Sequence, residues 1–398
     1  MLIVQKYGGT SVGTPEHILR VADRIATRHR AGDRLVIVVS AMGQTTDELL
    51  TLAGQVSPAP SRRELDMLLT AGERISMALL SMALGDRSVP AISFTGSQSG
   101  IITDTNHGRA RILEMRPIRI GPELDRGRVV IVAGFQGVSR EKEVTTLGRG
   151  GSDTTAVALA CGLGADRCEI YSDVDGVLTA DPRLIPSARL CPVVPWDVML
   201  ELARCGAGVM HARAVALATA TQTPFAVRSA FHEEPGTMIT GHAMESGPEI
   251  TAVTGHPAVT WVRITGIRAG DPAAADLVTR FGIAFDDVVS LLHGETGGAW
   301  ELSLCLRGDI PEAEVLAPAG DLPQGAAGRL EHGLASVSLV GSGFFRDIAS
   351  AGRAQRTLVR AGIEPARVIA GSLSLTFLVP RPAYAEAQRA LHREFLES

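Results

Sequence analysis

Apolar runs of strand length alternate with stretches of helical period through about the first 230 residues of the chain. Continuous apolar runs at 34–40 and 129–133 fit buried parallel strands, and each ends in a loop rich in small or polar residues. Runs at 2–7 and 91–94 also fit strands, and residues 61–84 have a helical period. This alternation predicts an α/β fold with a mostly parallel sheet flanked by helices.

The pattern changes after residue 250. A set of three strands and a helix is predicted at 260–267, 273–281 (the helix), 286–292 and 300–306. A second set in the same βαββ order follows at 335–340, 348–361 (a helix), 367–369 and 372–379, and a helix at 383–396 ends the chain. We therefore predict a first domain at 1–241, a linker at 242–250, and two small ferredoxin-like α+β units at 251–334 and 335–398.

Residues 144–183 contain two polar loops separated by one apolar, helix-like run. In the first loop, three glycines at 148, 150 and 151 allow the backbone to approach a ligand closely, and Ser152 and Asp153 lie near a helix N-terminus, where an anion can bind. The second loop is rich in aspartate and follows a short apolar strand, but it lacks the spacing and the closing glutamate of an EF-hand. A solvated surface turn is the alternative for either loop alone.

The first strand ends in Lys6, Tyr7 and a Gly8-Gly9-Thr10 turn. A strand, a glycine turn and a following helix N-terminus form an anion-binding nest, although the Walker A pattern is absent. Of the 38 basic residues only Lys6 and Lys142 are lysine. Because the chain uses arginine wherever a generic cation would serve, we expect Lys6 to be functional rather than a solvated charge at a strand end.

Composition narrows the range of partners and compartments. The net charge of −5 indicates neither nucleic acid nor an anionic membrane surface as a partner. The sequence begins without the pattern of a signal peptide, and no uninterrupted apolar run approaches a membrane span, so we expect a cytoplasmic protein. The five cysteines are odd in number and lack CxxC spacing, which favours reduced, mostly buried thiols over a metal site or disulfides.

Several segments of roughly the first 240 residues resemble the aspartokinases of the amino acid kinase family, and they follow that family's order. They are KYGGTS at 6–11, the loop at 40–46, LLTAGERIS at 68–76, SFTGSQSGIITD at 93–104, GFQG at 134–137, TTLGRGGSDTTAVALA at 145–160 and YSDVDGVLTADPR at 171–183. The resemblance implies transfer of the γ-phosphate of ATP to the side-chain carboxylate of L-aspartate, giving 4-phospho-L-aspartate for amino-acid biosynthesis.

The resemblance also implies roles for individual residues. Lys6 would contact the phosphates and Asp153 would orient it, and these two are the implied catalytic residues. The amino acid would be held by Ser40, Thr45, Glu73, Phe135, Arg149 and Ser152. The nucleotide would be held by Lys6, Gly8, Gly9, Thr10, Ser172, Asp173 and Arg183. Mg²⁺ is expected with ATP, held largely by phosphate and water rather than by a protein metal site.

One departure from the family pattern concerns a cation of the nucleotide site. Where the family reads GAKVLHPR, residues 206–213 read GAGVMHAR, so Gly208 replaces a lysine that would contact phosphates. Arg183 or Arg213 could substitute. Two hypotheses therefore remain open. One is an active aspartate kinase, and the other is a catalytically impaired homologue that binds a nucleotide or an amino acid.

The two C-terminal units resemble the tandem ACT domains that follow the kinase domain in aspartokinases, pair between chains and often bind lysine or threonine. The first unit departs from the family's GxPG-like turn, since residues 268–272 have no glycine after Pro272. The second, at 339–344, keeps its glycines better. We therefore expect a structural dimerisation module, a homodimer, and weak or absent feedback control by lysine or threonine.

Overall fold

The structure, a computed structural model, describes residues 1–397 except 243–249, 269–270, 286–287, 297–298, 321, 323–324 and 343–347. The chain forms two compact units. The first comprises Met1–Val177, Leu190–Leu200 and Gly208–His242, and the second comprises Leu178–Arg189, Glu201–Ala207 and Ala243–Ser398. Most of the predicted linker at 242–250 lies outside the described residues. The predicted domain boundaries therefore stay a prediction.

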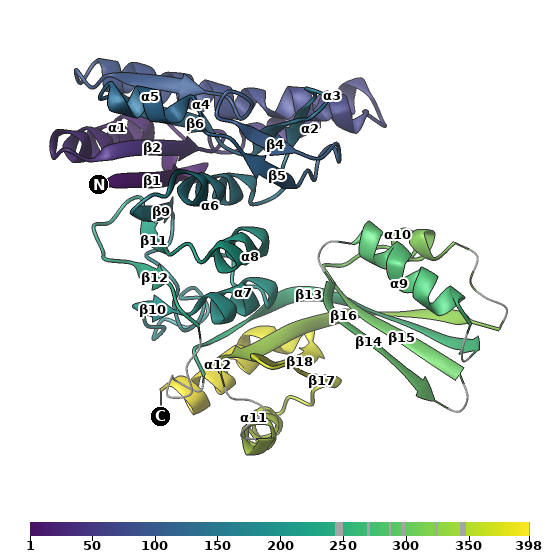
Figure 1. The fold of residues 1–398 in the computed structure, drawn as a ribbon. Coiled ribbons are helices and arrows are strands. Elements are labelled where there is room, and N and C mark those ends of the chain that lie inside the picture. The colour runs from purple at the N-terminus through teal and green to yellow at the C-terminus, as the bar shows by residue number, and fades with distance from the viewer. Residues whose placement is uncertain are drawn as a thin grey trace. The chain divides into compact units, whose positions relative to one another are not determined.

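An eight-stranded sheet forms the centre of the first unit (Figure 1). In spatial order its strands are β10 (Val193–Val194), β12 (Thr237–Ile239), β11 (Phe225–Ser229), β9 (Arg167–Ser172), β1 (Leu2–Tyr7), β2 (Arg34–Val39), β6 (Val129–Ala133) and β3 (Ala91–Phe94). The six strands from β11 to β3 are all parallel, and only β12 runs antiparallel to its neighbour β11. The predicted parallel sheet is confirmed.

Helices cover both faces of this sheet. Helices α1 (Pro15–Arg30) and α4 (Ala71–Gly85) bury Ile25 and Leu80 against Ile3 and Ile37 in one core. The other face carries α6 (Gly151–Leu163), which is buried over most of its length. Side chains alternate between the two faces of a strand, so Tyr7 on β1 joins the first core while Lys6 points to the side of α6.

A smaller sheet extends the first unit. Its order is β5 (Ile112–Met115), β4 (Ile101–Thr103), β7 (Gln136–Ser139) and β8 (Val144–Thr146). The remaining helical elements are η1 (Thr10–Val12), α2 (Thr45–Val56), α3 (Arg62–Leu69), α5 (Ile120–Asp125), α7 (Trp196–Arg204), which crosses the boundary between the units, and α8 (Ala212–Thr221).

The helical stretch Arg62–Gly85 is long and apolar enough to cross a membrane by length and composition. Such a match is weak evidence, because helices in the core of a protein pass the same test. Here Leu80 and Leu84 are fully buried in the core of the first unit, and Asp66 and Glu73 are buried as well. One side of this stretch therefore packs in the core of the first unit, while Met67, Ile75, Leu79 and Met82 are exposed.

The second unit is built on a six-stranded antiparallel sheet. Its order is β14 (Val288–Thr296), β15 (Ala299–Arg307), β13 (Ala252–Arg268), β16 (Ala327–Val340), β18 (Ser374–Pro380) and β17 (Arg367–Ala370). One part of the sheet packs with α9 (Ala273–Ala284), α10 (Glu312–Leu316) and η2 (Ala317–Ala319). The other part packs with α11 (Ile348–Arg360), η3 (Arg381–Ala383) and α12 (Tyr384–Leu396). Two α+β units are thus present, as predicted.

Two separate hydrophobic cores show which parts of the six-stranded sheet belong to each of the two α+β units. One core joins Ile264, Phe281 and Leu304, and the other joins Val253, Phe377 and residues of α11 and α12. The start of β13 therefore packs with the unit predicted at 335–398. Sequence analysis placed this strand at 260–267 only, because Gly255 and Pro257 interrupt the pattern. The strand accommodates them with a shift of register between His256 and Val259.

Candidate functional site

The loops that carry most of the predicted site residues leave the same edge of the first sheet. Because β1, β2, β6 and β9 are parallel, their carboxyl ends lie together, and this is where open α/β sheets bind ligands. The four loops begin at Gly8, Ser40, Gly134 and Asp173. A backbone hydrogen bond from Gly43 N to Gly9 O, 3.0 Å long, joins the first two loops.

An ion pair joins Lys6 to the first turn of α6. Lys6 Nζ lies 2.6 Å from Asp153 Oδ1, and both side chains are only 12–13% exposed. Backbone N–H groups and the helix dipole make the start of α6 electropositive, and Lys6 adds a full charge beside it. This arrangement can bind an anion such as a phosphate group.

The Gly8-Gly9-Thr10 turn approaches its neighbours closely. A Cβ on Gly9 would lie 3.0 Å from Ala41 O, and one on Gly8 would lie 3.4 Å from Lys6 Nζ. The N–H of Gly8 donates to Tyr171 O at 3.2 Å, so this donor is already used within the protein. The predicted nest must therefore rely on Lys6 and the remaining backbone donors of the turn.

Glu73 is a buried carboxylate on α4, 3% exposed. Its Oε1 accepts a hydrogen bond of 3.2 Å from Ala41 N, while its Oε2 has no hydrogen-bond partner among the described residues. Burial raises the pKa of Glu73 to about 7. A half-satisfied buried carboxylate of this kind fits an ammonium group.

Arg149 lies between two glycines of positive φ, Gly148 at +75° and Gly150 at +69°. A Cβ on Gly150 would lie 2.1 Å from the Cβ of His211, so only glycine fits there. The Arg149 side chain is exposed and makes no ion pair within the described part of the chain. Its guanidinium is thus available to bind a carboxylate with both oxygens.

Phe135 has a φ of +67°, an uncommon conformation for a residue with a side chain. Its carbonyl accepts from Leu147 N at 2.8 Å, and its ring lies beside Gly151. Ser152 is buried, with its Oγ 2.7 Å from the position of a Cβ on Gly134. The structure thus brings the predicted Phe135 and Ser152 together at the start of α6.

The other predicted substrate and nucleotide residues lie at the ends of β2 and β9. Ser40 N donates to Tyr7 O at 3.1 Å, and Thr45 Oγ1 donates to Met42 O at 2.7 Å. Ser172 Oγ donates to Asp173 Oδ1 at 3.0 Å. Arg183 belongs to the second unit, where its guanidinium lies 2.8 Å from Asp181, so its place in the nucleotide site stays a prediction.

Gly208 is exposed, and a Cβ there would meet nothing within 4 Å. The arginine that sequence analysis considered as a replacement, Arg213, donates to the carbonyl oxygens of Leu147 and, at 2.8 Å, of Ala110. Arg213 therefore holds backbone segments together, and a lysine at position 208 would be tolerated sterically.

Sequence analysis missed the hydrogen-bonded cluster of Asp66, His107 and Thr146, in which Asp66 and Thr146 are buried and His107 is half-buried. Asp66 is fully buried and accepts hydrogen bonds from both other side chains. An acid within the apolar run LDMLL was the only available signal, and it does not distinguish a buried carboxylate from a solvated one.

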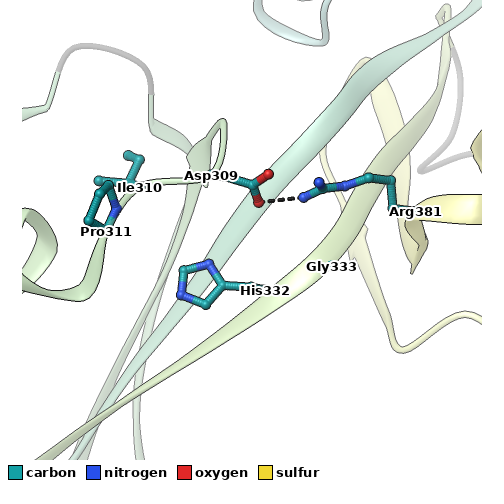
Figure 2. Close-up of a pocket in the computed structure, with 6 residues that line it drawn as sticks. All are labelled: Asp309, Ile310, Pro311, His332, Gly333 and Arg381. Carbon is teal, nitrogen blue, oxygen red and sulfur yellow. Dashed lines mark hydrogen bonds and ion pairs between the residues drawn. The ribbon is translucent and has the colours of Figure 1, made fainter.

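A separate pocket of about 420 Å³ lies in the second unit (Figure 2). It is lined by Asp309, Ile310, Pro311, His332, Gly333 and Arg381. Arg381 forms an ion pair with Asp309, and no predicted site residue lines the pocket. Arg381 and Asp309 are therefore paired with each other in this pocket, while Arg381 Nε has no hydrogen-bond partner among the described residues.

Comparisons with known proteins show the family to which the chain belongs. Residues 1–229 match the model of the amino acid kinase family. The chain is 43% identical over 400 residues to an aspartokinase of Geobacillus stearothermophilus, covering 99% of this chain and 97% of that protein. It is 42% identical over 403 residues to an aspartokinase of Mycolicibacterium smegmatis, covering 99% and 96%.

Among solved structures, E. coli aspartokinase III in complex with aspartate and ADP matches with a TM-score of 0.84 at 23% identity, covering 100% of both chains. At that identity the match speaks for the fold. The two full-length relatives show the family. The chain therefore belongs to the aspartokinases of the amino acid kinase family, and its activity is that of an aspartate kinase that uses a nucleotide.

Proposed function

We propose that this aspartate kinase is catalytically competent, transfers the γ-phosphate of ATP to the side-chain carboxylate of L-aspartate, and responds weakly or not at all to lysine and threonine. The observation that carries the proposal is the Lys6–Asp153 ion pair at the start of α6. It provides a fixed cation where the loops of the sheet edge meet.

The chemistry requires cations more than a general base. The substrate carboxylate is already ionised and nucleophilic, so the difficulty is to bring it close to an anionic nucleotide and to stabilise the charge on the transferred group. Lys6 neutralises phosphate charge, and Asp153 keeps the lysine in place. Gly8, Gly9, Thr10, Ser172 and Asp173 are proposed to surround the nucleotide.

The amino acid is proposed to bind between Glu73 and Arg149. The unpaired oxygen of Glu73 receives its ammonium, and the exposed guanidinium of Arg149 receives a carboxylate. Ser40, Thr45, Phe135 and Ser152 complete this side. A zwitterion satisfies both charged groups, which favours an amino acid over a simple carboxylate.

Mg²⁺ is proposed to arrive with ATP, where it would neutralise phosphate charge. The described residues contain no group of three histidine, cysteine or carboxylate side chains that could hold a metal. The ion would therefore be held mainly by phosphate oxygens and water.

The impaired homologue remains the second candidate, and Gly208 favours it. Position 208 offers no cation, and Arg213 is engaged with two backbone carbonyls. The intact Lys6–Asp153 pair argues for activity.

Weak feedback control and a homodimer are proposals about the second unit. The turn before α9 lacks a glycine after Pro272, although residues 269 and 270, like 343 and 344 in the second copy, lie outside the described part. Among the described residues, the edge strand β14 pairs only with β15, and it exposes Leu291 and Leu292. An apolar sheet edge of this kind needs covering, which supports pairing of this region with a second chain in the cytoplasm.

The direct test of the proposed function is turnover of ATP and L-aspartate with Mg²⁺, with the acyl phosphate trapped by hydroxylamine. We expect aspartyl hydroxamate to form at a rate that changes less than about twofold on addition of lysine or threonine. ATP binding without hydroxamate would support the impaired homologue instead. Strong inhibition by either amino acid would contradict the proposed loss of control.

The two lysines of the chain provide a matched pair of variants. Lys6→Ala removes the cation at the start of α6, and we expect kcat to fall on the order of 10²–10³-fold in a folded protein whose melting temperature is lowered, because Asp153 loses its partner. Lys142→Ala removes an exposed lysine and should leave kcat unchanged. The hydroxamate assay measures both. Near-normal kcat in Lys6→Ala would refute the phosphate-site assignment.

Restoring the family lysine tests the second candidate. Because Gly208 has open space around it, Gly208→Lys should fold normally. If Lys6 and the start of α6 supply sufficient positive charge, kcat should change by less than about threefold. An increase on the order of a hundredfold would show that the natural chain is an impaired kinase.

The raised pKa of Glu73 predicts a pH dependence of binding. In the ligand-free protein, Glu73 is about half protonated near pH 7. An ammonium group beside Glu73 favours its ionised form. Binding of L-aspartate near pH 7 should therefore release part of a proton, and the Kd should fall as the pH rises from 6 to 8. Calorimetry in buffers of different ionisation enthalpy measures the proton. Glu73→Gln should abolish its release, and Glu48→Gln, an exposed control, should not.

The raised pKa of Glu73 also predicts how the stability of the ligand-free protein changes with pH. The native state binds the Glu73 proton more tightly than the unfolded state, whose pKa is near 4.5. Stability from this group is thus fully present below pH 4.5 and is lost as the pH rises through about 7. Glu73→Gln should remove this loss, which is at most on the order of 3 kcal/mol. An unchanged pH profile of unfolding in Glu73→Gln would show that Glu73 titrates normally.

A further inference from the structure

Asp66 is a fully buried carboxylate on α3, and both of its oxygens are occupied. Oδ1 accepts from Thr146 Oγ1 at 2.5 Å and from Gly108 N at 3.0 Å. Oδ2 lies 2.7 Å from His107 Nδ1. An ionised carboxylate only accepts hydrogen bonds, so His107 carries its proton on Nδ1 here. One side chain therefore ties α3 to two other segments.

The two segments that Asp66 holds are also joined to each other. Ala110 N donates to Thr146 O at 2.9 Å, and Arg213 donates to the carbonyl oxygens of Ala110 and Leu147. Gly148 lies so close to the loop that a Cβ on it would be 3.0 Å from Gly108 O. The chain from Thr146 to Gly148 is thus fixed against residues 107–110 immediately before Arg149.

Asp66 and Glu73 are seven residues apart in the helical stretch Arg62–Gly85. Asp66 lies on α3 and Glu73 on α4, and the two helices follow each other with only Thr70 between them. Glu73 holds the loop after β2 through Ala41 N, and Asp66 holds the segment before Arg149. Two consecutive helices therefore each hold one segment of the proposed amino-acid site.

We propose that Asp66 is a positioning residue for the aspartate site. Through Thr146 and Gly108 it fixes the backbone path that ends at Arg149, and so the direction of the Arg149 guanidinium. This inference rests on the proposed role of Arg149. A carboxylate with a merely structural role would instead affect stability, or both substrates equally.

Conservative variants test the proposal without unfolding the site. Asp66→Asn keeps the size and shape of the side chain but removes the negative charge that strengthens the hydrogen bonds from Thr146 Oγ1 and Gly108 N. Thr146→Val keeps the shape and removes one donor. We expect each to raise the KM for aspartate about 5- to 20-fold, while the KM for ATP changes less than about twofold and kcat less than about threefold.

Thr103→Val is the matched control. Thr103 is a buried threonine of the same small sheet, and its hydroxyl binds Thr145 Oγ1 at 2.6 Å rather than Asp66. Its KM for aspartate should stay within about twofold of the natural value. An equal rise in this control, or equal changes in the KM values of both substrates, would overturn the proposal.

A double-mutant cycle with Arg149→Ala separates the proposal from its premise. If Asp66 acts through Arg149, Asp66→Asn should raise the KM for aspartate less than about twofold in the Arg149→Ala background. If the two effects on the KM for aspartate are additive, Asp66 does not act through Arg149. The positioning role is then overturned, while the proposed role of Arg149 stands. An Arg149→Ala variant with an unchanged KM would overturn both. If turnover proves absent, the calorimetric Kd for aspartate replaces the KM throughout.

Discussion

The ion pair between Lys6 and Asp153 is the contact on which the proposed chemistry depends. It joins the central strand β1 to the first turn of α6, and it holds the nearly buried Lys6 side chain beside the N-terminus of that helix. The alternation of side chains along β1 makes the pair possible, because it places Lys6 on the face that α6 covers and Tyr7 in the opposite core.

The proposed aspartate site depends on two buried carboxylates, Glu73 and Asp66. Glu73 lies on α4 and Asp66 on the preceding helix α3, and both side chains are buried. One oxygen of Glu73 has no hydrogen-bond partner among the described residues, whereas both oxygens of Asp66 are hydrogen-bonded to protein groups. Two chemically identical groups thus have different tasks because their hydrogen-bond partners differ. The role of each carboxylate therefore follows from the protein groups that surround it.

Much of the first unit could be predicted from sequence because its signals are local. Continuous apolar runs gave the parallel strands, and the scarcity of lysine singled out Lys6. Contacts between distant segments could not be predicted. The role of Asp66 depends on Gly108 and Thr146, which lie 42 and 80 residues away. Arg213 appeared to be a spare cation until its carbonyl partners were seen. The start of β13 was missed because Gly255 and Pro257 resemble a break, whereas the strand absorbs them with a register shift.

The most direct measurement of the central claim is a crystal structure of the protein with L-aspartate and ADP. The account predicts Lys6 Nζ within hydrogen-bond distance of a phosphate oxygen, the aspartate ammonium on Glu73, and one of its carboxylates on Arg149. Nucleotide or aspartate bound away from these three side chains would contradict it.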